Sequence, residues 1–427
     1  MRIDRNFYLD KLKNKMHNGK VKIITGIRRC GKSYLLFNIF TNYLLSLGVK
    51  NKQLITLALD DIEFASYRNP FKLNEYVRSR IENPDNKYYL LIDEIQYSKA
   101  VLNPDVEGDT ITFVDTLLSL MKIKNLDIYV TGSNSKMLSR DILTSFRDRG
   151  DQIHIYPLSF KELSGVYDDK DEALNDYMLF GGMPYLLSLN SFEEKSFYLK
   201  NLFKETYLKD IIERNNILNS DEIFEILLDF ISSSVGSLTN PNRIANRFSS
   251  EKKIKISNNT ITTYLTYLED AFILYNAKRY DVKGAKYFNT PSKYYFSDIG
   301  LRNARLNFRQ IDEGHIIENI IYNELISRGY SVDVGMVEVF ERIENKTQRK
   351  RFEVDFIVNK GNQKFYIQSA LNLNTIEKLN QERASLRKIN DSFKKIIIVR
   401  DRIINRYDEY GIYYIDLKKF LLEDDLI

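Results

Sequence analysis

The chain has 427 residues, of which 43% are hydrophobic and 28% charged, a balance typical of a folded protein and not of a disordered one. One hydrophobic core rarely organises so long a chain, so we expect several domains. The formal net charge of +5 permits contact with nucleic acid without requiring it. No apolar run approaches the roughly 20 residues of a membrane-spanning helix, and charged residues occupy the N-terminal positions where a signal peptide would be apolar.

Cysteine and histidine are scarce. The single cysteine, Cys30, cannot form an intrachain disulfide, which fits a reducing compartment, and we expect a cytoplasmic protein. The three histidines, at positions 17, 154 and 315, are far apart and have no cysteine partners, so a zinc site of ordinary spacing is not expected.

Apolar strand-like runs alternate with helical patterns over the first 160 residues, which predicts a mostly parallel α/β sheet. Between the first two expected strands, apolar residues recur at helical spacing over 33–47, and this pattern stops at Gly48. The strands have the near-continuous apolar character of buried parallel strands. They are expected at 21–25, 54–59, 88–92, 128–131 and 153–156.

Later parts of the chain follow other patterns. Helices are expected from 160 to about 234, interrupted by Gly-Gly-Met-Pro at 181–184, which must form a tight turn or loop. Residues 257–299 combine an amphipathic helix with short strands at 278–281 and 293–296, an order that suggests a winged helix. A separate α/β domain follows, with helices at 316–327 and 375–389 and strands at 332–340, 351–358, 365–369 and 396–399.

A glycine-rich motif follows the first strand. Residues 26–33 fit G-x-x-x-x-G-K-[ST] without a mismatch. The glycines allow backbone N–H groups to point at phosphates, and the helix beginning near Lys32 adds its positive end. Lys32 is expected to reach the terminal phosphates and Ser33 to bind Mg²⁺. We predict nucleotide contacts from Gly26, Ile27, Arg28, Arg29, Cys30, Gly31, Lys32, Ser33 and Tyr34.

Two free positions of this motif have alternative explanations. Arg29 is as well suited to a structural ion pair as to contact with phosphate or adenine. Cys30 is explained by its small side chain, and redox sensing is the alternative.

Two acids complement the glycine-rich motif. The strand at 88–92 delivers Asp93 and Glu94 at its carboxyl end, where ligands of open α/β sheets bind. Asp93 is expected to orient the Mg²⁺ ligands, and Glu94 to polarise the attacking water. On their own, both acids would be equally explained as the cap of a helix. Together with the glycine-rich motif they predict an ATP-hydrolysing enzyme.

Two further segments supply candidates for catalysis. Ser133 and Asn134 leave the next strand and are candidates to hold the lytic water or the γ-phosphate, with Asn134 preferred; the alternative is an ordinary turn. Arg147 and Arg149 precede the fifth strand. One of them would act in trans on a neighbour's γ-phosphate, which implies a dimer or ring, and the alternative is solvated surface arginines.

With these residues in place, the sequence resembles the prokaryotic AAA-type ATPases whose C-terminal portion is a domain of unknown function. The resemblance covers nearly the whole chain. It rests on I-T-G-I-R-R-C-G-K-S (24–33), L-I-D-E-I-Q (91–96), Y-V-T-G-S-N-S-K-M-L-S (129–139), P-L-S-F-K-E (157–162) and F-G-G-M-P (180–184). The family would have glycine in place of Asp148, and Arg149 is therefore preferred over Arg147 as the trans-acting residue.

The chain is expected to have four parts: the resemblance implies a core, a winged helix and a nuclease-like tail, and the helical pattern after residue 160 predicts a lid or spacer between the first two. A five-stranded, AAA-type P-loop core is expected at 1–160, a helical lid or spacer at 161–235, and a winged-helix-like part at 236–310. The last part, 311–427, resembles the restriction-endonuclease-like PD-(D/E)xK fold.

In active PD-(D/E)xK nucleases a helix glutamate, an aspartate and an E-x-K triplet converge on Mg²⁺. Glu318 and Asp355 match the first two positions, but the triplet here is Gln368-Ser369-Ala370. Because a carboxylate and the lysine are missing, we predict that this domain is not a nuclease. A basic cluster would contact phosphate or simply form an exposed hairpin turn. Its members are Lys346, Arg349, Lys350 and Arg351.

The sequence thus predicts an oligomeric ATPase that binds ATP and Mg²⁺ and couples hydrolysis to work on DNA or on a protein partner, with no membrane partner. Two alternatives remain: a nucleotide-dependent binding switch with little turnover, and a DNA-cleaving effector. Glu94 argues against the switch, and the incomplete triplet argues against the effector.

Overall fold

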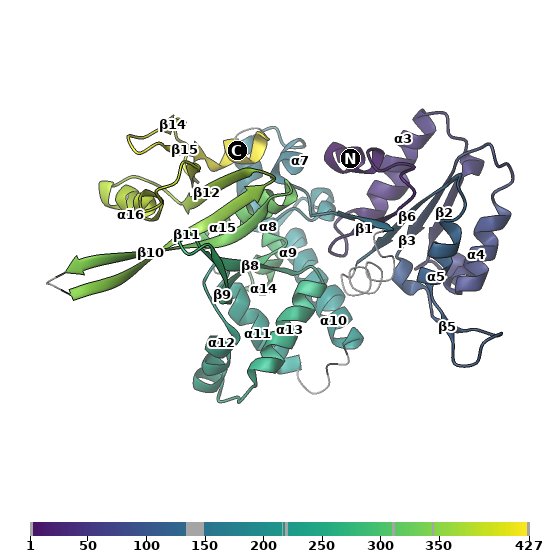
Figure 1. The fold of residues 1–427 in the computed structure, drawn as a ribbon, viewed down its shortest axis with the longest axis horizontal. Coiled ribbons are helices and arrows are strands. Elements are labelled where there is room, and N and C mark those ends of the chain that lie inside the picture. Colours follow the sequence, from purple (N-terminus) through teal and green to yellow (C-terminus); the bar gives the residue numbers. More distant parts are fainter. Residues whose placement is uncertain are drawn as a thin grey trace. The chain divides into compact units, whose positions relative to one another are not determined.

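The computed structural model describes residues 3–133, 149–215, 217, 221–309, 312–343 and 346–424 (Figure 1). The chain divides into two compact units, Met1–Pro157 with Asp270–Phe272, and Leu158–Glu269 with Ile273–Ile427. Within the described ranges, no helix is both long and apolar enough to cross a membrane.

The first unit is built on a five-stranded sheet in the order β2-β3-β6-β1-β7, and every neighbouring pair of strands is parallel. This sheet confirms the predicted α/β class and matches the core of a P-loop NTPase. The strands are β1 (Val21–Thr25), β2 (Leu54–Ala58), β3 (Tyr88–Asp93), β6 (Leu126–Gly132) and β7 (Gly150–His154), and a small separate hairpin contains β4 (Val101–Leu102) and β5 (Thr110–Ile111).

The three central strands β1, β3 and β6 are buried along their whole length, as their continuous apolar sequences predict. Helices α4 (Pro70–Ser79) and α5 (Phe113–Leu120) pack on the sheet through one hydrophobic cluster. Each leucine or isoleucine buried in it contributes about 1.5–3 kcal/mol. Its members include Leu73, Val77, Leu117 and Leu120 from the helices and Ile55, Leu90 and Ile128 from the strands.

The helix predicted at 33–47 is confirmed. It runs through α2 (Lys32–Tyr34), a π-helical stretch η1 (Leu35–Phe40) and α3 (Thr41–Ser46). Gly48 follows with φ of 86°, a left-handed conformation that ends helices. Another helix, α1 (Asn6–Lys13), precedes the first strand.

The second unit begins with helices, as predicted, and these are interrupted at 181–184. Gly181 has φ of 76°, and an added Cβ at Gly182 would overlap the carbonyl oxygen of Leu158, so this loop requires its glycines. The helices are α7 (Phe160–Ser164), α8 (Lys170–Phe180), α9 (Phe192–Asn201), α10 (Lys209–Arg214), α11 (Asp221–Ser233), α12 (Pro241–Arg247), α13 (Asn258–Asp270) and α14 (Ile299–Arg305).

An eight-stranded mixed sheet forms the rest of this unit, in the order β14-β15-β13-β12-β11-β10-β8-β9. The hairpin β8–β9, expected in the winged-helix-like part, pairs through β8 with β10, so it shares one sheet with the strands expected after residue 316. The strands are β8 (Leu274–Asp281), β9 (Lys286–Phe296), β10 (Ser331–Ile343), β11 (Lys346–Lys360), β12 (Gln363–Ala370), β13 (Lys394–Val399), β14 (Arg406–Tyr407) and β15 (Ile412–Asp416).

The helices predicted in the last part are confirmed as α15 (Glu313–Ser327) and α16 (Ile376–Arg387), and a short helix α17 (Leu417–Leu422) follows the final strand. Leu386 of α16 packs with Val354, Tyr366 and Ile397 of three neighbouring strands in a second hydrophobic cluster. Figure 1 shows that the long hairpin β10–β11 extends beyond the other strands of its sheet.

Candidate nucleotide-binding site

The glycine-rich loop joins the carboxyl end of β1 to α2. Gly26 has φ of 148°, and an added Cβ there would overlap the carbonyl oxygen of Ile155. Gly31, with φ of 98°, occupies the position before the helix. Any side chain at Gly26 would therefore displace the loop from the adjoining chain, which explains why the motif requires glycine at that position.

Lys32 points its ammonium back into the loop. Its Nζ donates to the carbonyl oxygens of Gly26 and Ile27, both at 3.1 Å, and the residue is only 3% exposed. The ammonium is thus held at the amino end of a helix, where anions bind. Of the other predicted nucleotide contacts, Ile27 and Cys30 are buried, Arg28, Gly31 and Ser33 are partly buried, and Arg29 and Tyr34 are exposed.

Arg5 supports the loop from outside the motif. Its guanidinium donates to the carbonyl oxygen of Cys30 at 3.0 Å and to that of Tyr156 at 2.9 Å, and it lies over the Tyr8 ring. The Cys30 thiol is buried and faces the carbonyl oxygen of Ile155 at 3.5 Å. Burial of the thiol favours a structural role for Cys30 over redox sensing. No motif marked Arg5, since its partners are 25 and 151 residues away.

The two acids lie where the sequence predicts, at the carboxyl end of β3. Thr131, fully buried at the end of the neighbouring strand β6, contacts both of them. Its hydroxyl donates to the Asp93 carboxylate and accepts the backbone N–H of Glu94 at 3.0 Å. One hydroxyl thereby fixes the carboxylate of Asp93 and the backbone of Glu94.

Glu94 adopts a left-handed conformation, with φ of 52° and ψ of 51°, which is strained for a residue with a Cβ. Its carboxylate accepts hydrogen bonds from the Gln96 amide and, at 3.3 Å, from the Ser133 hydroxyl. Ser133 was expected from the sequence, but Thr131 and Gln96 were not. Both belong to the quoted motifs Y-V-T-G-S-N and L-I-D-E-I-Q, so a signal for them was present.

The oxygens of this site suit Mg²⁺. Ser33 is partly exposed at the start of α2, which follows β1, and Asp93 is the last residue of β3. Both residues therefore lie at the carboxyl ends of the parallel strands. One hydroxyl and one carboxylate, completed by phosphate and water, are the usual protein contribution to a nucleotide-bound Mg²⁺. Among the described residues, no three His, Cys, Asp or Glu side chains form a metal-binding group by themselves.

The remaining catalytic candidates are Asn134 and the two arginines before β7. Asn134, Arg147 and Asp148 lie outside the described residues. Arg149 directly precedes β7 and is exposed, and its carbonyl accepts the N–H of Val21 at 3.0 Å, at the opposite edge of the sheet. The five-residue strand β1 separates that edge from the loop by about 16 Å. The backbone of Arg149 therefore lies beside the amino end of β1, whereas the glycine-rich loop follows its carboxyl end.

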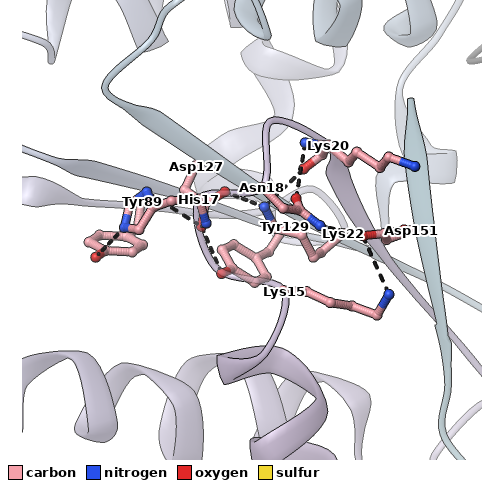
Figure 2. Close-up of polar contacts among 9 residues, drawn as sticks. All are labelled: Lys15, His17, Asn18, Lys20, Lys22, Tyr89, Asp127, Tyr129 and Asp151. Carbon is pink, nitrogen blue, oxygen red and sulfur yellow. Dashed lines mark hydrogen bonds and ion pairs between the residues drawn. The ribbon is translucent and has the colours of Figure 1, made fainter. Parts of the chain in front are cut away.

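A buried polar cluster lies at the amino ends of β1 and β6 (Figure 2). The Asp127 carboxylate pairs with the ammonium of the fully buried Lys22, accepts the Tyr129 hydroxyl at 2.8 Å and accepts the backbone N–H of His17 at 3.0 Å. Burial lowers the pKa of Lys22 and raises that of Tyr129. The cluster ties the 14–20 segment to the sheet, and we assign it a structural role because Lys22 has its charge matched by Asp127.

In the second unit the structure brings together the residues of the incomplete nuclease motif. Glu318 on α15 and Asp355 on β11 both approach the ammonium of Lys293, at 2.7 and 3.6 Å. The Gln368 side chain accepts the backbone N–H of Asp355 at 3.3 Å, and the buried Ala370 contributes no charge. Lys293, which comes from β9, was not expected from the sequence.

The basic cluster on the β10–β11 hairpin is partly neutralised. Arg349 and Arg351 are half exposed, and both pair with Glu338. Lys350 is exposed, and the side chain of Lys346 lies outside the described part.

Comparison with known proteins identifies the chain's relatives. A family model described as AAA domain matches residues 18–164, and one described as a domain of unknown function (DUF8612) matches 171–312. An uncharacterised protein of Haemophilus influenzae is 32% identical over 403 residues, 93% of each chain. The uncharacterised protein MJ1544 of Methanocaldococcus jannaschii is 30% identical over 429 residues, 96% of this chain and 87% of the relative.

Solved structures resemble the chain only distantly. The Aeropyrum pernix ORC2 protein, in ADPNP–ADP complexes, is 11% identical, with a TM-score of 0.38 over 75% of this chain and 92% of that one. A likeness at this level carries no argument about the site. The two family models confirm an AAA domain followed by a domain of unknown function. The chain therefore belongs to the same family as the Haemophilus and Methanocaldococcus proteins, and its residues 18–164 form an AAA domain of nucleotide-binding ATPase type.

Proposed function

We propose that this protein binds ATP with Mg²⁺ and hydrolyses it to ADP and phosphate. The observation that carries the proposal is that the glycine-rich loop and the two acids both lie at the carboxyl ends of the parallel strands. The glycine-rich loop with the buried Lys32 ammonium follows β1, and the Asp93–Glu94 pair follows β3. Both acids are fixed by Thr131 of β6, the strand between β1 and β3.

Each residue then has a defined task. Lys32 exchanges the carbonyl oxygens of Gly26 and Ile27 for the terminal phosphate oxygens of the nucleotide. Mg²⁺, when bound, neutralises phosphate charge, and Ser33 and Asp93 would hold it. Glu94 accepts a proton from the attacking water, while Gln96 and Ser133 bond its Oε2 and hold the carboxylate in place.

The test is steady-state ATP turnover, with nucleotide affinity measured alongside. Glu94→Gln should lower the rate by about 100-fold or more while ATP still binds, since it removes only the proton acceptor. Lys32→Ala should weaken binding as well. Glu63→Gln, an exposed carboxylate in the same unit, is the matched control and should behave as the parent. Equal turnover in the parent and Glu94→Gln would refute hydrolysis at this site.

A specific observation favours a second candidate, a nucleotide-dependent switch with little turnover. The Oε2 of Glu94 accepts hydrogen bonds from both Gln96 and Ser133, which restrain the carboxylate from turning toward an attacking water. A switch would bind ATP tightly, with turnover in the parent no higher than in Glu94→Gln under all partner conditions.

We further propose that the active form is a homo-oligomer in which Arg149 reaches the γ-phosphate of a neighbouring chain. The support is its exposed position at the sheet edge far from its own loop. Arg149→Ala and Lys32→Ala should each lose turnover. Mixing them should restore part of it, because one chain then supplies an intact loop and the other an intact arginine. No recovery on mixing, in oligomers that exchange subunits, would exclude a shared site.

The work coupled to hydrolysis is proposed to act on DNA or on a protein partner through the second unit. We retain the division into a helical lid at 161–235, a winged-helix-like part at 236–310 and an inactive nuclease-like part at 311–427. The Thr239–Ser292 bridge, which joins the segment before α12 to β9, supports the second of these parts. DNA retention that weakens with rising salt, together with DNA-stimulated turnover, would identify DNA as the partner. Absence of both would favour a protein.

A further inference from the structure

A buried lysine lies at the centre of a group of carboxylates in the second unit. The Lys293 ammonium is 2.7 Å from Glu318 Oε1, 2.6 Å from Glu353 Oε1 and 3.6 Å from Asp355 Oδ1. Its side chain is 2% exposed. Three acids therefore surround one ammonium that is almost completely withdrawn from water.

The hairpin β8–β9 brings this lysine to the acids. β10 pairs with β8 only between Arg279 and Asp281, beyond a shift of register in the hairpin. The part of β9 that carries Lys293 instead meets α15, where the Asn319 side chain bonds both the N–H and the carbonyl of Phe296 at 2.8 Å. The lysine is thus held by its own strand in a fixed position.

The surrounding hydrogen bonds keep the acids in place. Tyr295 donates its hydroxyl to Glu318 Oε1 at 2.6 Å, and Ser369 donates both its N–H and its hydroxyl to Asp355 Oδ2, at 2.8 and 2.7 Å. Burial raises the pKa of Glu318 to about 7, against the opposing effect of Lys293. Three acidic side chains thus face a single ammonium.

We propose that the Lys293 ammonium is a tethered cation that fills a carboxylate pocket suited to a divalent metal ion, so that the native chain binds no metal there. Within the described residues, no group of acids, histidines and cysteines is arranged to hold a metal as it stands. The three acids are instead arranged around the Lys293 ammonium, in agreement with the proposal.

Removal of the ammonium would leave three carboxylates close enough to share a metal ion. All three carboxylate oxygens lie within 3.6 Å of the Lys293 Nζ position. Oxygen–metal distances for hard divalent ions are about 2.0–2.6 Å. For an ion at the Nζ position, the oxygens of Glu318 and Glu353 would move inward by roughly an ångström or less, and that of Asp355 by slightly more. Carboxylate oxygens favour Mg²⁺, Ca²⁺ and Mn²⁺ over softer metals. Glu353 is partly exposed, so the group borders solvent on that side.

The experiment measures Mn²⁺ binding to the full chain without nucleotide, by electron paramagnetic resonance of free Mn²⁺. Lys293→Met removes the charge but keeps most of the side-chain volume, and it should gain one Mn²⁺ per chain and melt a few degrees higher in Mn²⁺. Lys293→Arg keeps the positive charge and should gain none. Lys278→Met, on an exposed position of the same hairpin, is the matched control.

The double variant Lys293→Met with Asp355→Asn should lose the gained ion, which assigns it to this pocket. A folded Lys293→Met that takes up no additional Mn²⁺ would overturn the proposal, as would parent protein whose Mn²⁺ binding depends on Asp355. If Lys293→Met does not fold alone, it should fold in Mn²⁺, because the ion replaces the missing charge. Failure of both Lys293→Met and Lys293→Gln to fold in Mn²⁺ also counts against the proposal.

Discussion

Thr131 illustrates how much a single hydroxyl contributes at the nucleotide site. It is fully buried, it donates to the Asp93 carboxylate and it accepts the Glu94 N–H. Without it, a buried carboxylate and a backbone N–H would both lack their partner. Losses of this kind affect folding and function together, because the same two groups are proposed to hold Mg²⁺ and water.

We predict that Thr131→Val lowers the free energy of unfolding by about 1–3 kcal/mol, the usual penalty for unpaired buried polar groups. It should also weaken Mg²⁺-dependent ATP binding and turnover. Thr131→Ser retains the hydroxyl and should keep both activities near the parent level. Urea unfolding and ATP turnover on the three proteins would check this, and a valine variant with parental turnover would show the hydroxyl to be dispensable.

Whereas Thr131 supports the site, Gln96 restrains the proposed catalytic base Glu94. Its amide holds the Glu94 carboxylate. A hydrogen bond to a charged group is worth about 1.5–3 kcal/mol, so releasing it makes the carboxylate more available to water. On the proposed function, Gln96→Leu should raise basal ATP turnover several-fold. The exposed Gln381→Leu serves as the control. A fall in turnover would mean that Gln96 positions Glu94 for catalysis.

At this scale the sequence predicted the positions of residues better than their contacts. It brought Asp93, Glu94 and Ser133 to one place, because parallel strands end at the same sheet edge. It did not predict that Gln96 contacts Glu94, nor that Arg5 contacts the loop, since the direction of a side chain depends on packing by distant segments.

At the scale of elements, the Gly181–Gly182 loop joins α8 to the rest of the second unit. Asp298, which caps α14, accepts the Gly182 N–H at 2.7 Å and is buried. The Leu158 N–H in turn donates to the Gly182 carbonyl at 2.8 Å. The loop therefore fits between a carboxylate and a neighbouring backbone, and the F-G-G-M-P motif has a structural explanation.

Gly182→Ala should destabilise the second unit by roughly 1–3 kcal/mol, because its Cβ overlaps the Leu158 carbonyl and that backbone must move. Gly165→Ala is the matched control: its Cβ would lie 3.5 Å from the nearest atom, an ordinary contact, so its effect should be small. Thermal unfolding of both variants measures the difference. Similar melting temperatures for the two variants would contradict this account of the loop.

The strand β7 was predicted, but its bounds were wrong. The expected strand at 153–156 begins instead at Gly150 and ends at His154. β7 lies at the edge of the sheet, and its first residues, Gly150, Asp151 and Gln152, carry no apolar signal. Their pairing with Val21–Ile23 of β1 extends the ladder without a hydrophobic pattern.

At the scale of the whole molecule, buried acids make stability depend on pH. Burial raises the pKa of Asp298 to about 6 from an ordinary value of 3.8, although backbone N–H groups bond its carboxylate. The folded state therefore retains a proton that the unfolded state has already released. The corresponding stability is fully present below about pH 4 and is lost as the pH rises through 6.

The expected loss between pH 4 and pH 7 is on the order of 1–3 kcal/mol. Asp298→Asn cannot titrate, so its unfolding free energy should change less with pH than that of the parent, whatever its absolute stability. Urea unfolding followed by circular dichroism at several pH values measures both slopes. Glu318, also raised, titrates in both proteins and cancels in the difference. Parallel curves would mean that Asp298 is ionised throughout.

Local order in this chain could be read from the sequence, because hydrophobic periodicity and the fixed positions of the P-loop act over short distances. The strand Val21–Thr25, the following helix and the Asp93–Glu94 pair were all predicted in this way. Only the folded chain decided that β8–β9 joins the sheet of β10 and that Lys293 lies among three acids. These contacts join residues up to about 60 positions apart, and no local spacing rule constrains which distant side chains will share a buried site.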